Sequence, residues 1–223
     1  MIDIHSHILP GVDDGSRSLE MTKNLLALYR EEGVSAVVCT PHQSRELRRA
    51  EQLKAQFALL EEKVKDCGVK LYLGAEIYYY DGMLDDLNSG ELLTLNGTKY
   101  VLVEFSTRNE MAYIPDVVYE LSVAGYKPIV AHIERYGYLS LDGWREVKSN
   151  GGLIQVNASI FTKKECAKLV KKFMKADLVD FIASDCHNEG SRSVNFSAAK
   201  AYVAKKFSER YDKYFGENNI FKD

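Results

Sequence analysis

No uninterrupted apolar stretch in this sequence approaches the ~18 to 20 residues that a membrane-spanning helix needs. The N-terminus, Met-Ile-Asp-Ile-His, also lacks the basic and apolar regions of a signal peptide. We therefore expect a protein that does not insert into membranes and that works in the cytoplasm. Cysteine is scarce too: the four cysteines have no C-x-x-C spacing, so we expect reduced thiols rather than a disulfide framework.

The sequence has no excess of basic residues. Its 29 Lys and Arg stand against 32 Asp and Glu, which gives a formal net charge of -3. Proteins that hold nucleic acid neutralise its phosphates with clustered basic residues, so we expect no nucleic acid as the main partner. The hydrophobic fraction, 46% of 223 residues, is that of an ordinary globular protein.

Seven short apolar runs alternate with longer segments of helical spacing. The runs are nearly continuous in Val, Ile, Leu, Tyr and Phe, as in strands buried on both faces of a parallel sheet. They cover 1–4, 34–39, 70–74, 100–103, 128–131, 152–156 and 180–183. Between two of them, Ala50, Leu53, Phe57, Leu60 and Val64 follow the spacing of an amphipathic helix. No linker interrupts this pattern, so we expect one α/β domain over 1–223, either a barrel or an open doubly wound sheet.

Histidines and carboxylates gather where these strands end. Every histidine lies close to the carboxyl end of an expected strand, and four carboxylates do the same; the set is His5, His7, Asp14, His42, Glu76, Glu104, His132, Asp185 and His187. One such residue is commonly a cap or a surface residue, but nine together form a pattern. Because the carboxyl ends of parallel strands meet at one face of an α/β fold, we expect these side chains to converge.

These side chains are of the types that bind metal ions. His5-x-His7 places two imidazoles on one side of a strand, since side chains alternate with a period of two, and Asp185-x-His187 repeats the arrangement at the last strand. Nine ligands suit two or three divalent ions bridged by carboxylates, and His with Asp and Glu favours Mn, Fe or Zn over Ca. Four carboxylates against three such ions would leave a charge of about +2, which suits a phosphate dianion.

The motifs around these residues resemble those of a known family. In chain order they are His5-Ser6-His7-Ile8-Leu9-Pro10-Gly11-Val12-Asp13-Asp14-Gly15, Thr40-Pro41-His42, Gly74-Ala75-Glu76, Ala131-His132-Ile133-Glu134-Arg135-Tyr136 and Ser184-Asp185-Cys186-His187-Asn188. They resemble the PHP (polymerase and histidinol phosphatase) superfamily, and more narrowly its bacterial metal-dependent protein tyrosine phosphatases of the CpsB/YwqE type, which regulate capsule and exopolysaccharide synthesis. The resemblance implies a distorted (β/α)7 TIM-like barrel of the PHP type.

The resemblance also implies three divalent metal ions, with manganese expected ahead of iron, zinc or magnesium. The implied ligands of the three ions are, in turn, His5, His7, Glu76 and Asp185; Glu76, Glu104 and His132; and Asp14, His42 and His187. Three residues depart from the family pattern: Gln43 replaces a second histidine, Ile133 replaces a proline and Cys186 replaces an alanine. None of these departures removes an implied ligand.

The implied activity is hydrolysis of phosphotyrosine in proteins by metal-activated hydroxide. Arg135 and Arg192 match positions at which the family holds phosphate, and each guanidinium could donate two hydrogen bonds to phosphoryl oxygens. The implied partner is a phosphotyrosine protein, namely a bacterial tyrosine kinase of capsular or exopolysaccharide biosynthesis. The first alternative is a small-molecule phosphoesterase, such as a histidinol phosphatase.

A second alternative uses different chemistry. Residues 186–193, Cys-His-Asn-Glu-Gly-Ser-Arg-Ser, fit the C-x5-R-S/T pattern of cysteine-dependent tyrosine phosphatases, in which loop amides and a helix N-terminus activate a thiolate. Cys39-x5-Arg45 also fits, but Pro41 lacks an amide hydrogen. A cysteine mechanism leaves the other strand-end ligands unexplained. The non-enzyme alternative is a barrel that keeps metal as a structural or binding module.

Overall fold

The structure is a computed structural model in which residues 1–47, 49–162 and 166–216 are described. The strands are β1 Ile2–Ser6, β2 Ala36–Cys39, β3 His42–Gln43, β4 Lys70–Leu73, β5 Glu76–Tyr78, β6 Tyr100–Glu104, β7 Lys127–Val130, β8 Leu153–Asn157 and β9 Phe181–Ala183. The α-helices are α1 Leu19–Glu31, α2 Ala50–Val64, α3 Met83–Ser89, α4 Ile114–Val123, α5 Leu141–Ser149, α6 Cys166–Lys175, α7 Phe196–Lys206 and α8 Tyr211–Phe215. Four 3-10 helices complete the described elements: η1 Leu95–Gly97, η2 Ile133–Arg135, η3 Ala158–Thr162 and η4 Ser208–Arg210.

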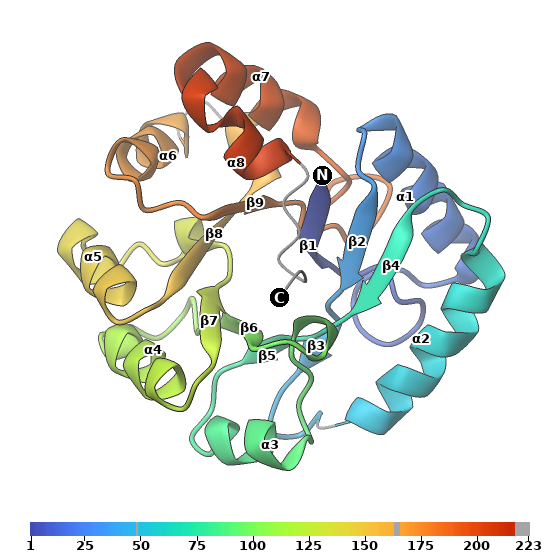
Figure 1. Ribbon diagram of the computed structural model, residues 1–223, viewed down its shortest axis with the longest axis horizontal. Coiled ribbons are helices and arrows are strands. Elements are labelled where there is room, and N and C mark those ends of the chain that lie inside the picture. The colour runs from blue at the N-terminus through green and yellow to red at the C-terminus, as the bar shows by residue number, and fades with distance from the viewer. Residues whose placement is uncertain (48, 163–165, 217–223) are drawn as a thin grey trace.

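All strand pairs are parallel, and the strands form two sheets. One sheet has the order β1-β2-β4 and the other the order β3-β5-β6-β7-β8-β9. The helices lie around the outside of the strands (Figure 1), as expected when the connections between parallel strands are helical. The expected α/β class is therefore confirmed, whereas the described strands do not form one closed sheet.

Each of the seven expected strand regions contains a strand, and two short strands that were not expected, β3 and β5, follow the second and the third of these regions. Thr40 and Pro41 separate β2 from β3, and Gly74 and Ala75 separate β4 from β5. Proline has no amide hydrogen to donate to a neighbouring strand, which interrupts the ladder. A Cβ atom on Gly74 would lie 2.7 Å from the Leu95 side chain, so this break also needs glycine. Backbone bonds from Gly74 to Cys39 (2.9 Å) and from Glu76 to Pro41 (3.2 Å) hold the two segments together across the break.

The first and last strands also meet. Ser6 and Cys186 form an isolated parallel bridge, His7 N donates to Cys186 O at 2.8 Å, and Asp185 N donates to His5 O at 3.0 Å. The segment after β9 is therefore paired with the end of β1. This pairing brings the two most specific motifs of the sequence, 5–15 and 184–188, to the same place.

Side chains from both sheets meet in the middle of the molecule. A small apolar cluster there takes one residue each from β1, β2, β6, β7 and β9, together with Leu95 and Ala131; its strand residues are Ile4, Val38, Leu102, Ile129 and Ala183. A much larger apolar core includes residues of the helices, such as Leu53 and Leu60 of α2 and Val203 of α7. Burial of Ala50, Leu53, Leu60 and Val64 confirms the apolar face expected for α2, and Phe57 of the same face is partly buried against the core.

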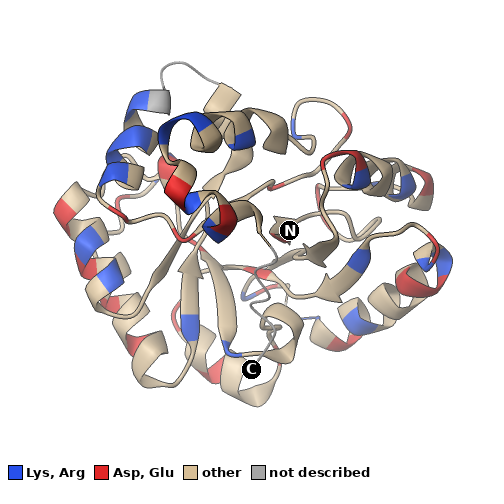
Figure 2. Cartoon of the chain, turned by 45° about the horizontal axis from the view of Figure 1, so that its top comes forward, with Lys and Arg blue, Asp and Glu red and all other residues tan. Residues whose placement is uncertain are grey.

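Lys and Arg residues are interspersed with Asp and Glu residues along most of the helices (Figure 2). None of the helices in the described ranges is both long enough and apolar enough to cross a membrane.

Candidate metal centre

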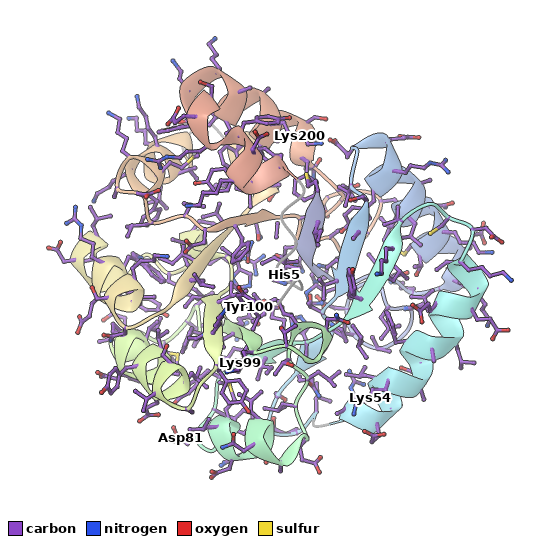
Figure 3. The ribbon with its side chains drawn as sticks, viewed as in Figure 1. His5, Lys54, Asp81, Lys99, Tyr100 and Lys200 are labelled. Carbon is purple, nitrogen blue, oxygen red and sulfur yellow. The ribbon has the colours of Figure 1, made fainter. Side chains whose placement is uncertain are left out.

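The structure brings the strand-end side chains together. His5, His42, Glu76 and Glu104 belong to strands, and the others lie in the segments that follow β1, β7 and β9. Figure 3 shows His5 near the middle of the ring of strands, whereas Lys54 and Asp81 lie at its rim. Six of the nine side chains are buried, His42 and Glu104 are partly exposed, and Asp14 is 61% exposed, which places it at the opening to solvent.

The two histidines of the first motif face each other. Their Nε2 atoms are 3.2 Å apart. Nδ1 of His5 lies 3.2 Å from Oε1 of Gln155, and Nδ1 of His7 lies 2.8 Å from Oδ2 of Asp13. Because these oxygens accept and do not donate, each Nδ1 carries the hydrogen, and in a neutral ring each Nε2 directs its lone pair at the centre. Histidines that bind metal are oriented in this way by an acceptor behind the ring.

Glu76 is the anion around which the imidazoles are arranged. Its Oε2 lies 3.3 Å from Nε2 of His5, 3.2 Å from Nε2 of His7 and 3.1 Å from Nδ1 of His42, while its Oε1 lies 2.8 Å from Nε2 of His132. Burial opposes ionisation of Glu76, but the charge of His5 and the hydrogen bonds from His132 and His42 hold its pKa well below the usual range. A carboxylate in contact with four imidazoles can bridge metal ions.

A second part of the cluster lies nearer to solvent. Nε2 of His42 and Nε2 of His187 each lie 3.3 Å from Oδ1 of Asp14. Nδ1 of His187 donates to the backbone oxygen of Asp185 at 2.9 Å, which leaves Nε2 as the acceptor. That Nε2 atom is buried and has no hydrogen-bond partner among the described residues. A buried nitrogen lone pair of this kind is costly unless a proton or a metal ion engages it.

The described chain contains three groups of residues that could each hold a metal ion. Within each group, the ligand atoms all lie within 4.8 Å of one another. The groups are His7, Asp14, His42 and His187; His5, His7 and Glu76; and His42, Glu76 and Glu104. These groups overlap with the three ligand sets that the family resemblance implies, but they differ in detail. His7 joins the outermost group, and His42 stands beside Glu76 and Glu104, where His132 was expected. His132 remains close, since its Nε2 is 3.5 Å from Oε1 of Glu104.

Asp185 connects the imidazoles to two arginines. Its Oδ1 lies 3.5 Å from Nε2 of His5 and 3.6 Å from Nε2 of His7. Its Oδ2 accepts from Arg135, and Nη2 of Arg192 binds both carboxylate oxygens, at 2.9 and 3.0 Å. Both arginine side chains are 35% exposed, so an anion can approach them from solvent.

Sequence reasoning missed the residues that hold the ligands in place. Asp13, next to the expected Asp14, binds His7 and also accepts from the backbone of Gly15 and His42, at 3.0 and 3.1 Å. Burial opposes its ionisation, but the hydrogen bond and the charge of His7 lower the pKa of Asp13 to about 2. A Cβ atom on Gly15 would lie 2.0 Å from His7 O, so only glycine lets this loop close against β1.

A polar chain along β8 was also missed. Oε1 of Gln155 accepts from His5 and, at 2.8 Å, from the backbone N–H of His132. Nε2 of Gln155 donates to Asn157, and Nδ2 of Asn157 donates to Asp185, both at 2.8 Å. Gln155 and Asn157 are two residues apart in a strand whose other members are apolar, so they point to the same side. That alternation in Leu153–Asn157 was a signal in the sequence.

Two of the clustered residues have unusual backbone conformations. Asn96, His132, Asp177 and Asp185 are the non-glycine residues of the described chain with positive φ, and His132 (33°) and Asp185 (52°) belong to the cluster. This region of backbone space is costly for residues with a Cβ atom, and such residues concentrate at functional sites. The backbone after β7 and β9 is thus bent in a way that turns both side chains toward the centre.

The cysteine alternative does not fit the loop after β9. Cys186 is fully buried beside Tyr29 and Asp3, and burial together with the charge of Asp3 raises the pKa of its thiol to about 12. The backbone N–H groups of His187 and Asn188 both donate to the carbonyl oxygen of Arg192, at 2.8 and 3.2 Å. These two amides are thus bonded to a carbonyl oxygen of their own loop and do not form the anion cradle that a cysteine phosphatase needs.

The donor set fits divalent metal ions. It combines imidazole nitrogens and carboxylate oxygens without a thiolate, it includes a buried unpaired Nε2, and acceptors behind three of the imidazoles fix which nitrogen faces inward. Parallel strands with such a cluster at their carboxyl ends, flanked by arginines, define an α/β protein of the metal-dependent hydrolase kind.

Comparison with known proteins identifies the family. Residues 1–221 match the family model described as capsular polysaccharide synthesis, CpsB/CapC. The chain is 36% identical to the tyrosine-protein phosphatase CpsB of Streptococcus pneumoniae, over 94% of this chain and 92% of that protein. It is 31% identical to the tyrosine-protein phosphatase YwqE of Bacillus subtilis, over 98% and 89% respectively. This chain belongs to the CpsB/CapC family.

Solved structures agree with this assignment. One solved structure comes from a study of YwqE from Bacillus subtilis and CpsB from Streptococcus pneumoniae, described as metal-dependent tyrosine phosphatases. It superposes on this chain with a TM-score of 0.88 at 26% identity. The superposition covers 100% of this chain and 97% of that one. A candidate histidinol phosphatase from Listeria monocytogenes shares the fold, with a TM-score of 0.53 at 14% identity over 84% of this chain and 95% of that one.

Proposed function

We propose that this protein is a metal-dependent protein tyrosine phosphatase. The observation that carries the proposal is the connected cluster of five imidazoles and four carboxylates, with Arg135 and Arg192 at its edge. Supporting it, the family relatives named above are tyrosine-protein phosphatases. The whole chain, 1–223, then forms one phosphatase domain, and the Ser6–Cys186 bridge supports a distorted (β/α)7 barrel interrupted between the two sheets.

The cluster would hold three divalent ions, with manganese as the first expectation. The residues that would hold them are His5, His7, Asp14, His42, Glu76, Glu104, His132, Asp185 and His187, and Glu76 would belong to more than one ligand set. When bound, such ions supply Lewis acidity: they polarise phosphoryl oxygens and lower the pKa of coordinated water. Counting four carboxylates against three divalent ions leaves about two positive charges, which match the charge of a phosphate monoester dianion.

The two arginines bind and orient the phosphoryl group. Each presents N–H donors in a fixed plane that can hydrogen-bond two phosphoryl oxygens, and both are anchored at Asp185. Binding of phosphate at this edge places the phosphorus beside the imidazole cluster, and the leaving tyrosyl oxygen then faces solvent. Phenolate is a stable leaving group, so the site needs no strong general acid, and the described residues around the arginines include no histidine outside the ligand set.

The proposed substrate is a phosphotyrosine protein, and specifically a bacterial tyrosine kinase of capsular or exopolysaccharide biosynthesis. Membership in the capsular polysaccharide synthesis family supports this choice. Because tyrosine phosphorylation consumes ATP, we expect the enzyme to meet its substrate in the cytoplasm.

Substrate preference tests the proposal. The manganese-loaded protein should hydrolyse a phosphotyrosine peptide with a kcat/KM well above that for the matching phosphoserine peptide, because alkoxide is the poorer leaving group. Histidinol phosphate, p-nitrophenyl phosphate and the two peptides should be compared under one set of conditions. A higher kcat/KM for histidinol phosphate than for the phosphotyrosine peptide would replace the proposed activity with the small-molecule alternative.

A further inference from the structure

A polar pocket lies directly beside the cluster. Its volume is about 450 Å³, within the usual range of ligand sites. Asp185, Arg135 and Arg192 belong both to this pocket and to the cluster, whereas no imidazole lines it. The rest of its wall comes from η2, from β8 and η3, and from the loop before α7. A substrate whose phosphate is bound by the two arginines can therefore extend into this space.

One atom in the pocket wall has no assigned role. Glu134, in the motif that also supplies His132 and Arg135, accepts a hydrogen bond from Asn157 N through Oε1 at 3.2 Å. Its Oε2 is shielded from solvent and has no hydrogen-bond partner among the described residues. An unpaired carboxylate oxygen in such a position is costly, and an occupant of the pocket that supplies a donor would remove the cost.

The composition of the pocket limits what that donor can be. Two arginines, Arg135 and Arg192, stand against two acidic residues, Glu134 and Asp185, so the charges offset each other and the pocket selects neither a basic nor an acidic side chain. An apolar ring would find Ile160 but otherwise mostly hydroxyl, amide and charged groups, among them those of Ser159, Ser193 and Asn195. A neutral chain with alternating N–H donors and C=O acceptors can form hydrogen bonds with the hydroxyl, amide and charged groups that line the pocket. The main chain of a peptide has this character.

We propose that the pocket is a subsite for the polypeptide that flanks the phosphotyrosine, and that Glu134 Oε2 accepts a hydrogen bond from a main-chain N–H of the substrate. This inference rests on the proposed function. Glu134 is then a specificity residue: it favours phosphotyrosine within a peptide over small phosphate esters. It touches no atom that reacts, and its effect should be confined to substrates that have the amide.

Glu134→Gln is the variant of choice. The amide oxygen of glutamine keeps the acceptor for Asn157 N, so its NH2 group takes the place of Oε2 and replaces an acceptor with a donor. For a phosphotyrosine peptide we expect kcat/KM to fall about tenfold or more, and for p-nitrophenyl phosphate, which has no amide, to stay within about twofold. Affinity for the same peptide with a non-hydrolysable phosphonate should fall in parallel. Glu189→Gln, which removes an exposed carboxylate from the neighbouring loop, is the matched control.

The substrate provides the other half of the test. Peptides that carry one N-methyl group on either side of the phosphotyrosine remove one N–H at a time. One of them should cost the wild-type protein about tenfold in kcat/KM and cost the Glu134→Gln variant much less, since the two changes remove the same hydrogen bond. Should the variant fail to fold in thermal unfolding, the N-methyl series on wild-type protein decides alone.

Two results would overturn the inference: equal losses on peptide and p-nitrophenyl phosphate, or an N-methyl series in which no position is sensitive. Failure of the proposed function looks different, because the wild-type protein would then prefer another phosphate ester, such as the phosphoserine peptide. N-methyl groups placed in that peptide would still report whether Glu134 binds a main-chain amide.

Discussion

Nε2 of His5 and Nε2 of His7 face each other at 3.2 Å, while Nδ1 of each ring is bound to an acceptor behind it. Two neutral rings held this way would bring lone pairs together, so a proton or a metal ion has to occupy the space they share. Without a bound cation, burial alone would lower the pKa of His5, but the charges of Glu76 and Asp185 raise it to about 9. His42 behaves similarly, since Glu76 raises its pKa to about 9 against the effect of burial.

Metal uptake should therefore release protons. At pH 7 a histidine with a pKa of about 9 is protonated, and a metal ligand must be deprotonated. Below that pKa, we expect the apparent affinity for manganese to rise about tenfold per pH unit for each proton displaced, and to level off above it. Titration calorimetry in buffers of different ionisation enthalpy counts these protons. Uptake at pH 7 with no proton release would contradict the proposed ligand roles of His5 and His42.

Glu76→Ala should remove the anion that the imidazoles share. With the carboxylate gone, four imidazoles lose their common partner, and we expect bound metal to drop and kcat/KM to fall by about three orders of magnitude or more. His7→Ala and Asp185→Ala should act in the same direction. Metal analysis and circular dichroism of each variant separate loss of metal from loss of fold, with Glu120→Ala on the exposed face of α4 as the control. Full occupancy with near-normal turnover would remove Glu76 from the site.

Asp13→Asn tests the support behind His7. The amide can accept the hydrogen bond from Nδ1 but loses the charge that stabilises it, and it can also turn its NH2 group toward the ring. We expect metal affinity to fall about 10- to 100-fold, as is usual when the partner behind a metal-binding histidine is changed. Asp142→Asn, at an exposed carboxylate of α5, should leave affinity unchanged. Equal metal affinities for the two variants would show that Asp13 stabilises the loop through its backbone hydrogen bonds and does not affect metal binding through His7.

The positions of the metal-type side chains could be predicted because parallel strands end at one face. A sequence that shows where His42, Glu76 or His132 follows a strand also shows on which face it will lie. The α/β class followed from the same pattern. The short strands β3 and β5 were not visible, since they resume after Pro41, beyond the apolar run 34–39, and after Gly74, which packs against Leu95.

The sequence could not show which side chains from distant strands and loops would form hydrogen bonds with one another. His5 and Gln155 are 150 positions apart, and nothing local indicates that the amide faces that imidazole. Asp13 and Asp14 are adjacent carboxylates, and only the closure of the loop on Gly15 decides that one binds His7 and the other approaches His187. Gln43, which replaces a second histidine of the family pattern, bonds the backbone of Glu91 and Leu93, at 3.3 and 2.8 Å.

Arg192→Lys should weaken phosphate binding. Lysine keeps the positive charge but lacks the planar guanidinium, whose Nη2 now binds both oxygens of Asp185. We expect kcat/KM for phosphotyrosine peptide to fall about tenfold or more, together with a raised inhibition constant for inorganic phosphate, while metal content stays the same. Arg145→Lys, at an exposed pair on α5, is the control. Unaltered inhibition by phosphate would exclude Arg192 from the phosphate site.

Cys186→Ala decides between metal and thiolate chemistry. The thiol is fully buried with a pKa raised to about 12, mainly by burial, so under assay conditions it is neutral and out of reach of substrate. Alanine, which is also the usual family residue at this position, should leave kcat/KM within about twofold and cost about 1 kcal/mol of stability or less through the lost packing.

The two mechanisms also predict opposite responses to a chelator and to iodoacetate. With metal ions as the catalytic group, a chelator should abolish turnover, manganese should restore it, and iodoacetate should have little effect on the native protein. With the thiolate as nucleophile, iodoacetate would inactivate the enzyme, the chelator would matter little and Cys186→Ala would be inactive. An alanine variant that is folded, carries its full complement of metal and yet lacks activity would refute the metal mechanism. We expect the variant to be active and to respond to the chelator as the wild-type protein does.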